Sequence, residues 1–262
     1  MSLPDIVYVV RFSRHSEELR HSLRSLVNLP HGKVWLAGHM PEWATGVEHI
    51  RTARKPGGHV DAKSNLRAAC EHPDVSEEFI YFNDDFFVMQ PFEQLPVMHR
   101  GPLSGVGGMA TAYQRAVKKG LALLRSKGIE EPLMYDLHAP MTVTKAGMLE
   151  ALDMARTDSM LQERTLFGNL QEVGGEKHHN FKVHRQDRGW HSWPFLSTND
   201  HTFRTLPVGE FIRGRFPTQS EYEATPAPKA RAPRSTVGVP ARRPIRRHAS
   251  STIRPIQRRT AP

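Results

Sequence analysis

The sequence predicts an α/β fold in which a Rossmann-like, mainly parallel sheet is flanked by helices. Two observations predict it. Short apolar runs typical of buried strands alternate with segments that carry helical periodicity. The chain has 262 residues, enough for one large domain with a sizeable core. We therefore expect one domain over residues 1–224, because no clean boundary interrupts this pattern before a change of composition at residue 225.

The first half of the chain supplies most of the predicted strands. Residues 5–10, "DIVYVV", read as a buried strand. Ser16 then resembles a helix N-cap, because two glutamates and an apolar stripe follow it. The stripe consists of Leu19, Leu23, Leu26 and Val27. Further strands are predicted at residues 33–38, 47–52 and 79–82, with a helix over 62–72.

The second half of the chain differs in composition and pattern from the first. Residues 113–126 read as a helix despite Gly120, and Thr144 is expected to cap another. Residues 174–204 are dense in His, Arg, Trp and Asn.

The net charge of +9 is concentrated in the last part of the chain. Residues 225–262 hold one Lys, nine Arg and no acidic residue, which leaves about −1 for residues 1–224. The same segment contains seven of the 20 prolines and few large apolar side chains. We expect a disordered basic tail. Such a tail could bind nucleic acid, an acidic protein or anionic lipid, or make only weak, nonspecific contacts with such surfaces.

Composition also bounds the compartment. No apolar run approaches the roughly 20 residues of a membrane span, and the N-terminus lacks the basic region of a signal peptide. The single cysteine, Cys70, excludes an internal disulfide framework. We therefore expect no membrane span and a cytoplasmic location.

The stretch "FIYFNDDFFVM", residues 79–89, raises the question of function. Four apolar residues run into Asp84 and Asp85, at the end of a predicted central strand. Ligands of open α/β sheets bind at that edge, where carboxylates hold Mg²⁺ or Mn²⁺ together with substrate phosphates. The plain alternative is that Asp84 caps a turn and Asp85 pairs with an arginine.

Several stretches share a pattern with one family. These are "ELRHSLRSL" (18–26), "MPEWA" (40–44), "KSN" (63–65) and "SEEFIYFNDDFFV" (76–88), in this order. They resemble the Stealth family of sugar-1-phosphate transferases, which includes bacterial capsule polymerases and the enzyme that tags lysosomal glycoproteins. Later blocks of that family look like "DLHAP" (136–140), "QERTLFGN" (162–169) and "FLSTND" (195–200). Residues 208–223 are similar to small phage-encoded glycosyltransferases.

The resemblance implies a GT-A-like mixed sheet and a metal-dependent transferase in a bacterium or a phage-infected host cell. The donor would be a nucleotide-diphospho-sugar and the acceptor a glycan or protein. Either sugar-1-phosphate or a plain glycosyl group would be transferred. Asp84 and Asp85 would chelate Mg²⁺ or Mn²⁺ on the donor diphosphate, and Asn83 would orient them or touch the donor.

The resemblance also suggests further donor contacts. Arg11, after the first strand, would reach the nucleotide or its phosphates. Arg20 and Arg24 lie one turn apart on a helix and would bind phosphate oxygens, unless they form ion pairs with Glu17, Glu48 or Asp85. Asn65 would lie near the donor or cap a helix. Asn199 and Asp200 would contact metal or sugar, or simply form a turn.

His138 is the expected general base, because histidine exchanges protons near neutral pH and the setting matches the family's histidine block. Asp136 would orient its ring, and Arg164 would stabilise charge on the transferred phosphoryl group. A lone histidine is otherwise more often structural. The competing hypothesis is a non-catalytic binding protein that acts through the basic tail.

Overall fold

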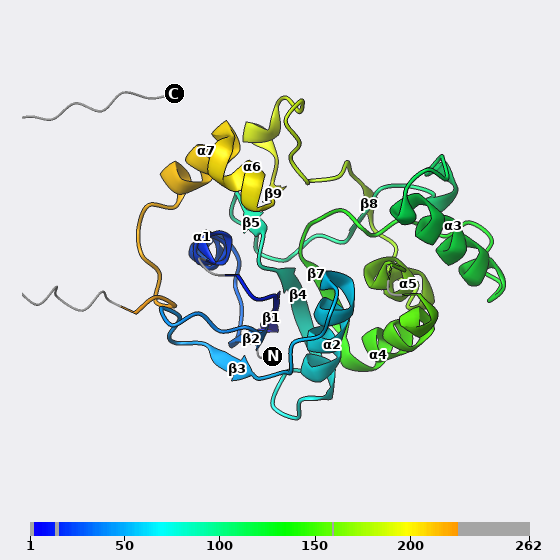
Figure 1. Ribbon diagram of the computed structural model, residues 1–262, viewed down its shortest axis with the longest axis horizontal. Helices are drawn as coiled ribbons and strands as arrows, with labels where there is room; N and C mark the ends of the chain where they lie inside the picture. The colour runs from blue at the N-terminus through cyan, green and yellow to red at the C-terminus, as the bar shows by residue number, and fades with distance from the viewer. Residues whose placement is uncertain (1–2, 14–15, 159, 225–262) are drawn as a thin grey trace, which may run out of the picture. The chain divides into compact units, whose positions relative to one another are not determined.

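The structure is a computed structural model that describes residues 3–13, 16–158 and 160–224. Its centre is a five-stranded sheet with the strand order β3-β2-β1-β4-β7 (Figure 1). The first four strands in this order are mutually parallel, whereas β7 runs antiparallel to β4. The strands are β1 (Asp5–Val10), β2 (Val34–Gly38), β3 (Glu48–Ile50), β4 (Glu78–Asn83) and β7 (Met141–Thr144). The predicted mixed, mostly parallel α/β sheet is confirmed.

Helices cover both faces of this sheet, and Figure 1 shows α1 and α2 on opposite sides of the strands. The helices are α1 (Glu17–Ser25), α2 (Gly58–Glu71), α3 (Ala112–Arg125), α4 (Lys145–Met154), α5 (Glu163–Leu170), α6 (Asp200–Thr205) and α7 (Pro207–Arg215). The helices predicted over 62–72 and 113–126 are therefore present, with α2 starting four residues earlier. Thr144 caps α4 through the Gly147 amide, as expected.

The alternation of side chains along the strands divides the core into two layers. Val7, Val9 and Tyr81 face a cluster built with α2, α4 and α5. Tyr8 and Phe82 face the other side, where they pack with α1 and with two short strands. These strands, β5 (Phe86–Val88) and β9 (Phe195–Ser197), pair antiparallel in a separate small sheet. A third pair, β6 (Met98–His99) and β8 (Glu176–Lys177), is parallel.

Two local expectations need correction. Ser16 precedes α1 in the left-handed region, with φ of 47°, and its side chain makes no cap hydrogen bond. Strands β5, β7 and β9 were not expected as strands, because each is too short to show an alternating pattern. The consequence matters for function: the Asp84–Asp85 turn joins β4 of the central sheet to β5 of the small sheet.

None of the helices in the described ranges combines the length and apolar character that crossing a membrane would require. The predicted basic tail, residues 225–262, lies outside the described residues.

Candidate active site

The site lies where the strand order of the central sheet reverses. From β1 the chain moves to β2 on one side, and β4 lies on the other side, so a crevice opens beyond the carboxyl ends of β1 and β4. Val9 of β1 is in register with Asn83 of β4. Arg11 and Asp84, which follow these strands, are therefore brought to the same edge. The predicted location of the carboxylates is the one that open α/β sheets use for ligands.

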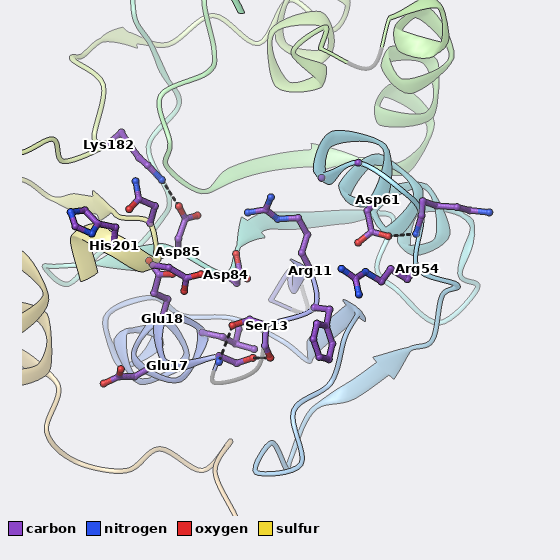
Figure 2. Close-up of a pocket in the computed structure, with 18 residues that line it drawn as sticks. Arg11, Ser13, Glu17, Glu18, Arg54, Asp61, Asp84, Asp85, Lys182 and His201 are labelled. Atoms are coloured by element: carbon purple, nitrogen blue, oxygen red, sulfur yellow. Dashed lines mark hydrogen bonds and ion pairs between the residues drawn. The ribbon is translucent and has the colours of Figure 1, made fainter. Parts of the chain in front are cut away.

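Three carboxylates gather at this edge. Figure 2 shows the side chains of Glu18, Asp84 and Asp85 on one side of a cavity, with Arg11 and Arg54 across from them. Asp85 accepts hydrogen bonds from the Lys182 ammonium at 2.6 Å and from the Ser197 hydroxyl at 3.1 Å. The Lys182 ammonium also donates to the Thr198 carbonyl. Asp85 thus has a cationic partner, a lysine rather than the arginine of the plain alternative.

The two aspartates differ in their electrostatic environment. Burial, together with the negative charge of Asp85, raises the pKa of Asp84 to about 7. Burial acts on Asp85 in the same direction, but the Lys182 charge and hydrogen bond outweigh it, so the pKa of Asp85 is lowered. Burial and the negative charges of the neighbouring aspartates also raise the pKa of Glu18 to about 8, against the opposing effect of the Thr198 hydroxyl hydrogen bond. A cation at Asp84 would relieve this crowding of negative charge.

Arg164 approaches the same edge from the opposite face of the sheet. It is the second residue of α5 and is only 5% exposed. Its guanidinium carbon lies 3.6 Å from the centre of the Tyr81 ring, and its Nη2 donates to the Asn83 side-chain oxygen at 3.2 Å. Its Nε is buried without a partner among the described residues. Its Nη1 lies 3.8 Å from the Glu163 carboxylate, and the side chain lines a cavity in which an anionic group could contact the guanidinium.

His138 lies in a strained backbone conformation, with φ of 55°. Its neighbours Leu137 and Ala139 are buried in the core, which holds the segment in place. Non-glycine residues in the left-handed region are uncommon and concentrate at functional sites. The strain therefore supports a functional role for this histidine.

Asn180 determines which ring nitrogen of His138 carries the proton. The side-chain oxygen of Asn180 accepts a hydrogen bond from the Lys182 backbone amide at 3.2 Å, which fixes the amide orientation. The same oxygen lies 2.9 Å from Nδ1 of His138. Nδ1 must then be the donor, which leaves the Nε2 lone pair available to accept a proton. The expectation that Asp136 orients this ring is thus wrong: its carboxylate instead accepts from the Tyr113 hydroxyl at 3.1 Å.

Replacing Asn180 by Ala is expected to remove this tautomer preference and to lower the rate of any reaction that uses His138 roughly tenfold, the equivalent of one hydrogen bond. Asn180→Asp, which keeps an acceptor oxygen, should retain the preference. Nitrogen-15 NMR of labelled histidine reads the tautomer directly. Equal spectra for wild type and Asn180→Ala would contradict this role.

Two cavities meet at the aspartates. One, of about 500 Å³, is lined by Arg11, Phe12, Glu18, Arg54 and Asp200, and we call it the α1 cavity. The other, of about 590 Å³, is lined by Lys63, Arg100, Asp136, His138 and Arg164, and we call it the His138 cavity. Arg11, Asp84, Asp85 and Lys182 line both. The site therefore has two chambers that share one carboxylate pair.

Two predicted donor contacts, Arg20 and Arg24, lie outside both cavities. Arg24 binds Glu223 through two nitrogens, at 2.7 and 2.8 Å, and Arg20 approaches the same carboxylate at 3.4 Å. The Glu223 side chain is 1% exposed and that of Arg24 13%. Both arginines therefore hold the end of the described chain against α1. Their pairing with Glu223 was not foreseen, because the expected partners were Glu17, Glu48 and Asp85.

Arg24→Met is expected to lower the free energy of unfolding by about 3 kcal/mol, because it leaves a buried carboxylate poorly paired. Burial alone would raise the pKa of Glu223, but the hydrogen bonds from Arg24 outweigh it and the pKa is lowered. The stabilisation should thus be present at neutral pH and be lost as pH falls through the lowered pKa. Urea denaturation of both proteins at pH 7 and pH 3 measures it. If Arg24→Met is as stable as the wild type but binds nucleotide more weakly, Arg24 contacts the donor and the ion pair with Glu223 is not its main role.

Asn65 also lies away from the cavities. It is 1% exposed, donates to the Val10 carbonyl at 3.3 Å and accepts from the Thr52 hydroxyl at 2.6 Å. It fastens α2 to the end of β1, directly before Arg11. Gly38 packs against it with φ of 110°, a conformation that favours glycine. Asn65 is thus placed to position Arg11 rather than to touch a ligand.

Asn199 and Asp200 do line the α1 cavity. Asn199 is also the N-cap of α6, where its side chain accepts from the Thr202 amide at 2.9 Å. The cap and the cavity position are compatible, because the cap uses the side-chain oxygen of Asn199 and not its side-chain nitrogen.

Sequence reasoning did not find Lys182, Asn180 or Glu18. The first two flank Phe181, which is fully buried. An alternating polar-apolar pattern in "NFKV", residues 180–183, was the available signal that both polar side chains share one face. Glu18 was given no site role, although it begins the stretch "ELRHSLRSL" (18–26) that carries the family resemblance, whereas Glu17 lies outside that stretch.

The number of carboxylates at the site suits Mg²⁺ or Mn²⁺ only if a substrate supplies the other ligands. In the described part of the chain, no group of three His, Cys, Asp or Glu side chains is arranged to hold a metal ion by itself. Mg²⁺ is commonly bound by one or two carboxylates when substrate phosphates supply the remaining ligands. Asp84 and Asp85, crowded and shared by two cavities, fit a cation that binds together with a diphosphate.

Comparison with known proteins finds a relative that matches part of the chain. No family model matches the chain. The chain is 30% identical over 137 residues to a capsular polysaccharide phosphotransferase, LcbA, of Aeromonas hydrophila. The match covers 47% of this chain and 35% of that protein, so the chain spans about a third of its relative's length.

Proposed function

We propose that this chain is a metal-dependent transferase that moves a sugar-1-phosphate from a nucleotide-diphospho-sugar to a glycan or protein acceptor. The observation that carries the proposal is the pair of cavities that meet at Asp84 and Asp85, with His138 and Arg164 in only one of them. The similarity to a capsular polysaccharide phosphotransferase and the Stealth resemblance support the same reaction class. A nucleotide-sugar fold of the GT-A kind is part of the proposal.

The α1 cavity suits the nucleoside end of the donor. Phe12 is 59% exposed at this cavity, an unusual position for a large aromatic ring, and the Arg54 guanidinium lies 5.3 Å from its centre. A ring of this kind offers a stacking face to a base. Arg11, which lines both cavities, would bind phosphate oxygens between them. A divalent cation held by Asp84 and Asp85 would add positive charge beside the diphosphate.

The His138 cavity then receives the acceptor. Nε2 of His138 takes the proton from the acceptor hydroxyl as its oxygen forms a bond to the β-phosphorus. The bond between that phosphorus and the bridging oxygen breaks, and the nucleoside monophosphate leaves with the electron pair. Arg164 stabilises the negative charge on the transferred phosphoryl oxygens. The sugar remains attached to the transferred phosphate.

A donor turnover screen tests the proposal. The purified protein is incubated with Mn²⁺ or Mg²⁺, a panel of nucleotide sugars and candidate acceptors, and the released nucleotide is identified by mass. A nucleoside monophosphate is the expected product. A nucleoside diphosphate would instead mean that the acceptor attacks the anomeric carbon and a glycosyl group moves. No release from any donor, with folded protein, would contradict both.

A further inference from the structure

The two cavities differ in charge. Lys and Arg outnumber Asp and Glu among the side chains that line the His138 cavity, five to four. In the α1 cavity the balance is reversed, four to six. An anionic group is therefore favoured on the His138 side, and a polar, uncharged group or a cation on the other.

The carboxylates of the His138 cavity are largely engaged by neighbours. Asp85 is paired with Lys182 at 2.6 Å. Glu163 accepts from the Tyr81 hydroxyl and Asp136 from the Tyr113 hydroxyl, each at 3.1 Å. Each of these acids is thus held by a neighbour other than Lys63 and Arg100, while the hydrogen bonds from neutral tyrosines leave the charges of Glu163 and Asp136 in place.

Lys63 and Arg100 are two cations without an acidic partner: in the described ranges, neither forms an ion pair with a carboxylate. The Lys63 ammonium donates to the neutral Leu161 carbonyl at 2.5 Å. Burial lowers the pKa of Lys63, and the charges of Glu163 and Asp158 oppose this shift only in part. The Arg100 backbone is fixed by a 2.7 Å bond from its amide to the Met134 carbonyl, which holds the residue at the cavity wall.

These two cations lie on the acceptor's side. Both line the His138 cavity and neither lines the α1 cavity. The acceptor must enter the His138 cavity, because its hydroxyl must reach His138. The donor diphosphate has Arg11 and the shared aspartates at the junction of the cavities, so it does not require Lys63 or Arg100.

From this arrangement we infer that the acceptor is an anionic sugar, with a carboxylate or phosphate group that binds Lys63 and Arg100 while its hydroxyl faces His138. The inference rests on the proposed function and names its acceptor class. A neutral glycan would leave both cations without an ion-pair partner in a partly buried cavity, which is unfavourable.

Calorimetry with three small sugars tests it without turnover. Glucuronic acid, glucose 6-phosphate and glucose probe a carboxylate, a phosphate and neither. At least one anionic sugar is expected to bind at least about tenfold more tightly than glucose. Arg100→Gln and Lys63→Gln should each remove most of that difference, while Arg100→Lys should keep it because the charge remains. Lys118→Gln, on the exposed side of α3, removes the same charge outside the cavity and should have no effect.

Two results would overturn the inference: equal affinity for all three sugars, or variants that weaken only the binding of a nucleotide diphosphate, which would give these cations to the donor. Whichever of the two anionic sugars binds more tightly shows whether the site prefers a carboxylate or a phosphate group. The proposed function fails separately. If the anionic sugars bind as expected but the donor screen releases no nucleotide, the anion-binding site is supported and the proposed transferase activity is contradicted.

Discussion

Asp84→Asn and Asp85→Asn are each expected to abolish most donor turnover, by at least about 100-fold, which corresponds to roughly 3 kcal/mol of lost transition-state stabilisation. The reason is that both side chains line both cavities, so any diphosphate bound across the junction lies against them. An amide keeps the shape of the carboxylate and removes the negative charge that a divalent cation requires.

The measurement is release of nucleotide in the donor screen, with calorimetry of nucleotide plus Mn²⁺ on the same proteins. Asp74→Asn is the matched control, because Asp74 is exposed in the loop before β4 and lines neither cavity. Asn is preferable to Ala at Asp85, since Ala would leave the Lys182 ammonium without its partner. Full turnover by both variants would show that neither aspartate takes part in the reaction, and it would contradict the proposed cation site.

His138→Gly is expected to lower turnover by about 10²–10⁴-fold, the usual contribution of a general base. Glycine is the informative replacement, because His138 has φ of 55° and glycine adopts this conformation without strain. Loss of activity therefore cannot come from backbone distortion. The cavity left by the ring would also admit free imidazole.

Added imidazole should restore part of the activity of His138→Gly and none of the activity of Asp84→Asn. The measurement is the initial rate of nucleotide release as a function of imidazole concentration. His191→Asn is the control, because His191 is exposed and lines neither cavity. A His138→Gly protein with wild-type turnover would show that proton removal occurs elsewhere. Unimpaired donor binding in that variant would place the defect in the chemical step.

The sequence by itself determined the strands of the parallel sheet and the position of its carboxylates. Val7, Tyr8 and Val9 belong to a continuous apolar run that is buried on both faces of the sheet, and such a run is visible in neighbouring residues of the sequence. Because β4 is an apolar run that ends at Asn83, Asp84 and Asp85 had to lie at its carboxyl edge. The resemblance that marked His138 and Arg164 also depended on local motifs.

Only the tertiary structure decided which side chains meet. Lys182 pairs with Asp85 across 97 positions of the chain, and Arg24 pairs with Glu223 across 199. Ion pairs form between any opposite charges that the fold brings within a few ångströms, and no local pattern records that distance. For the same reason Asn180, not Asp136 on the other side of Leu137, orients His138. The division of the site into an acidic and a basic chamber likewise arises from segments that are remote in sequence and close in space.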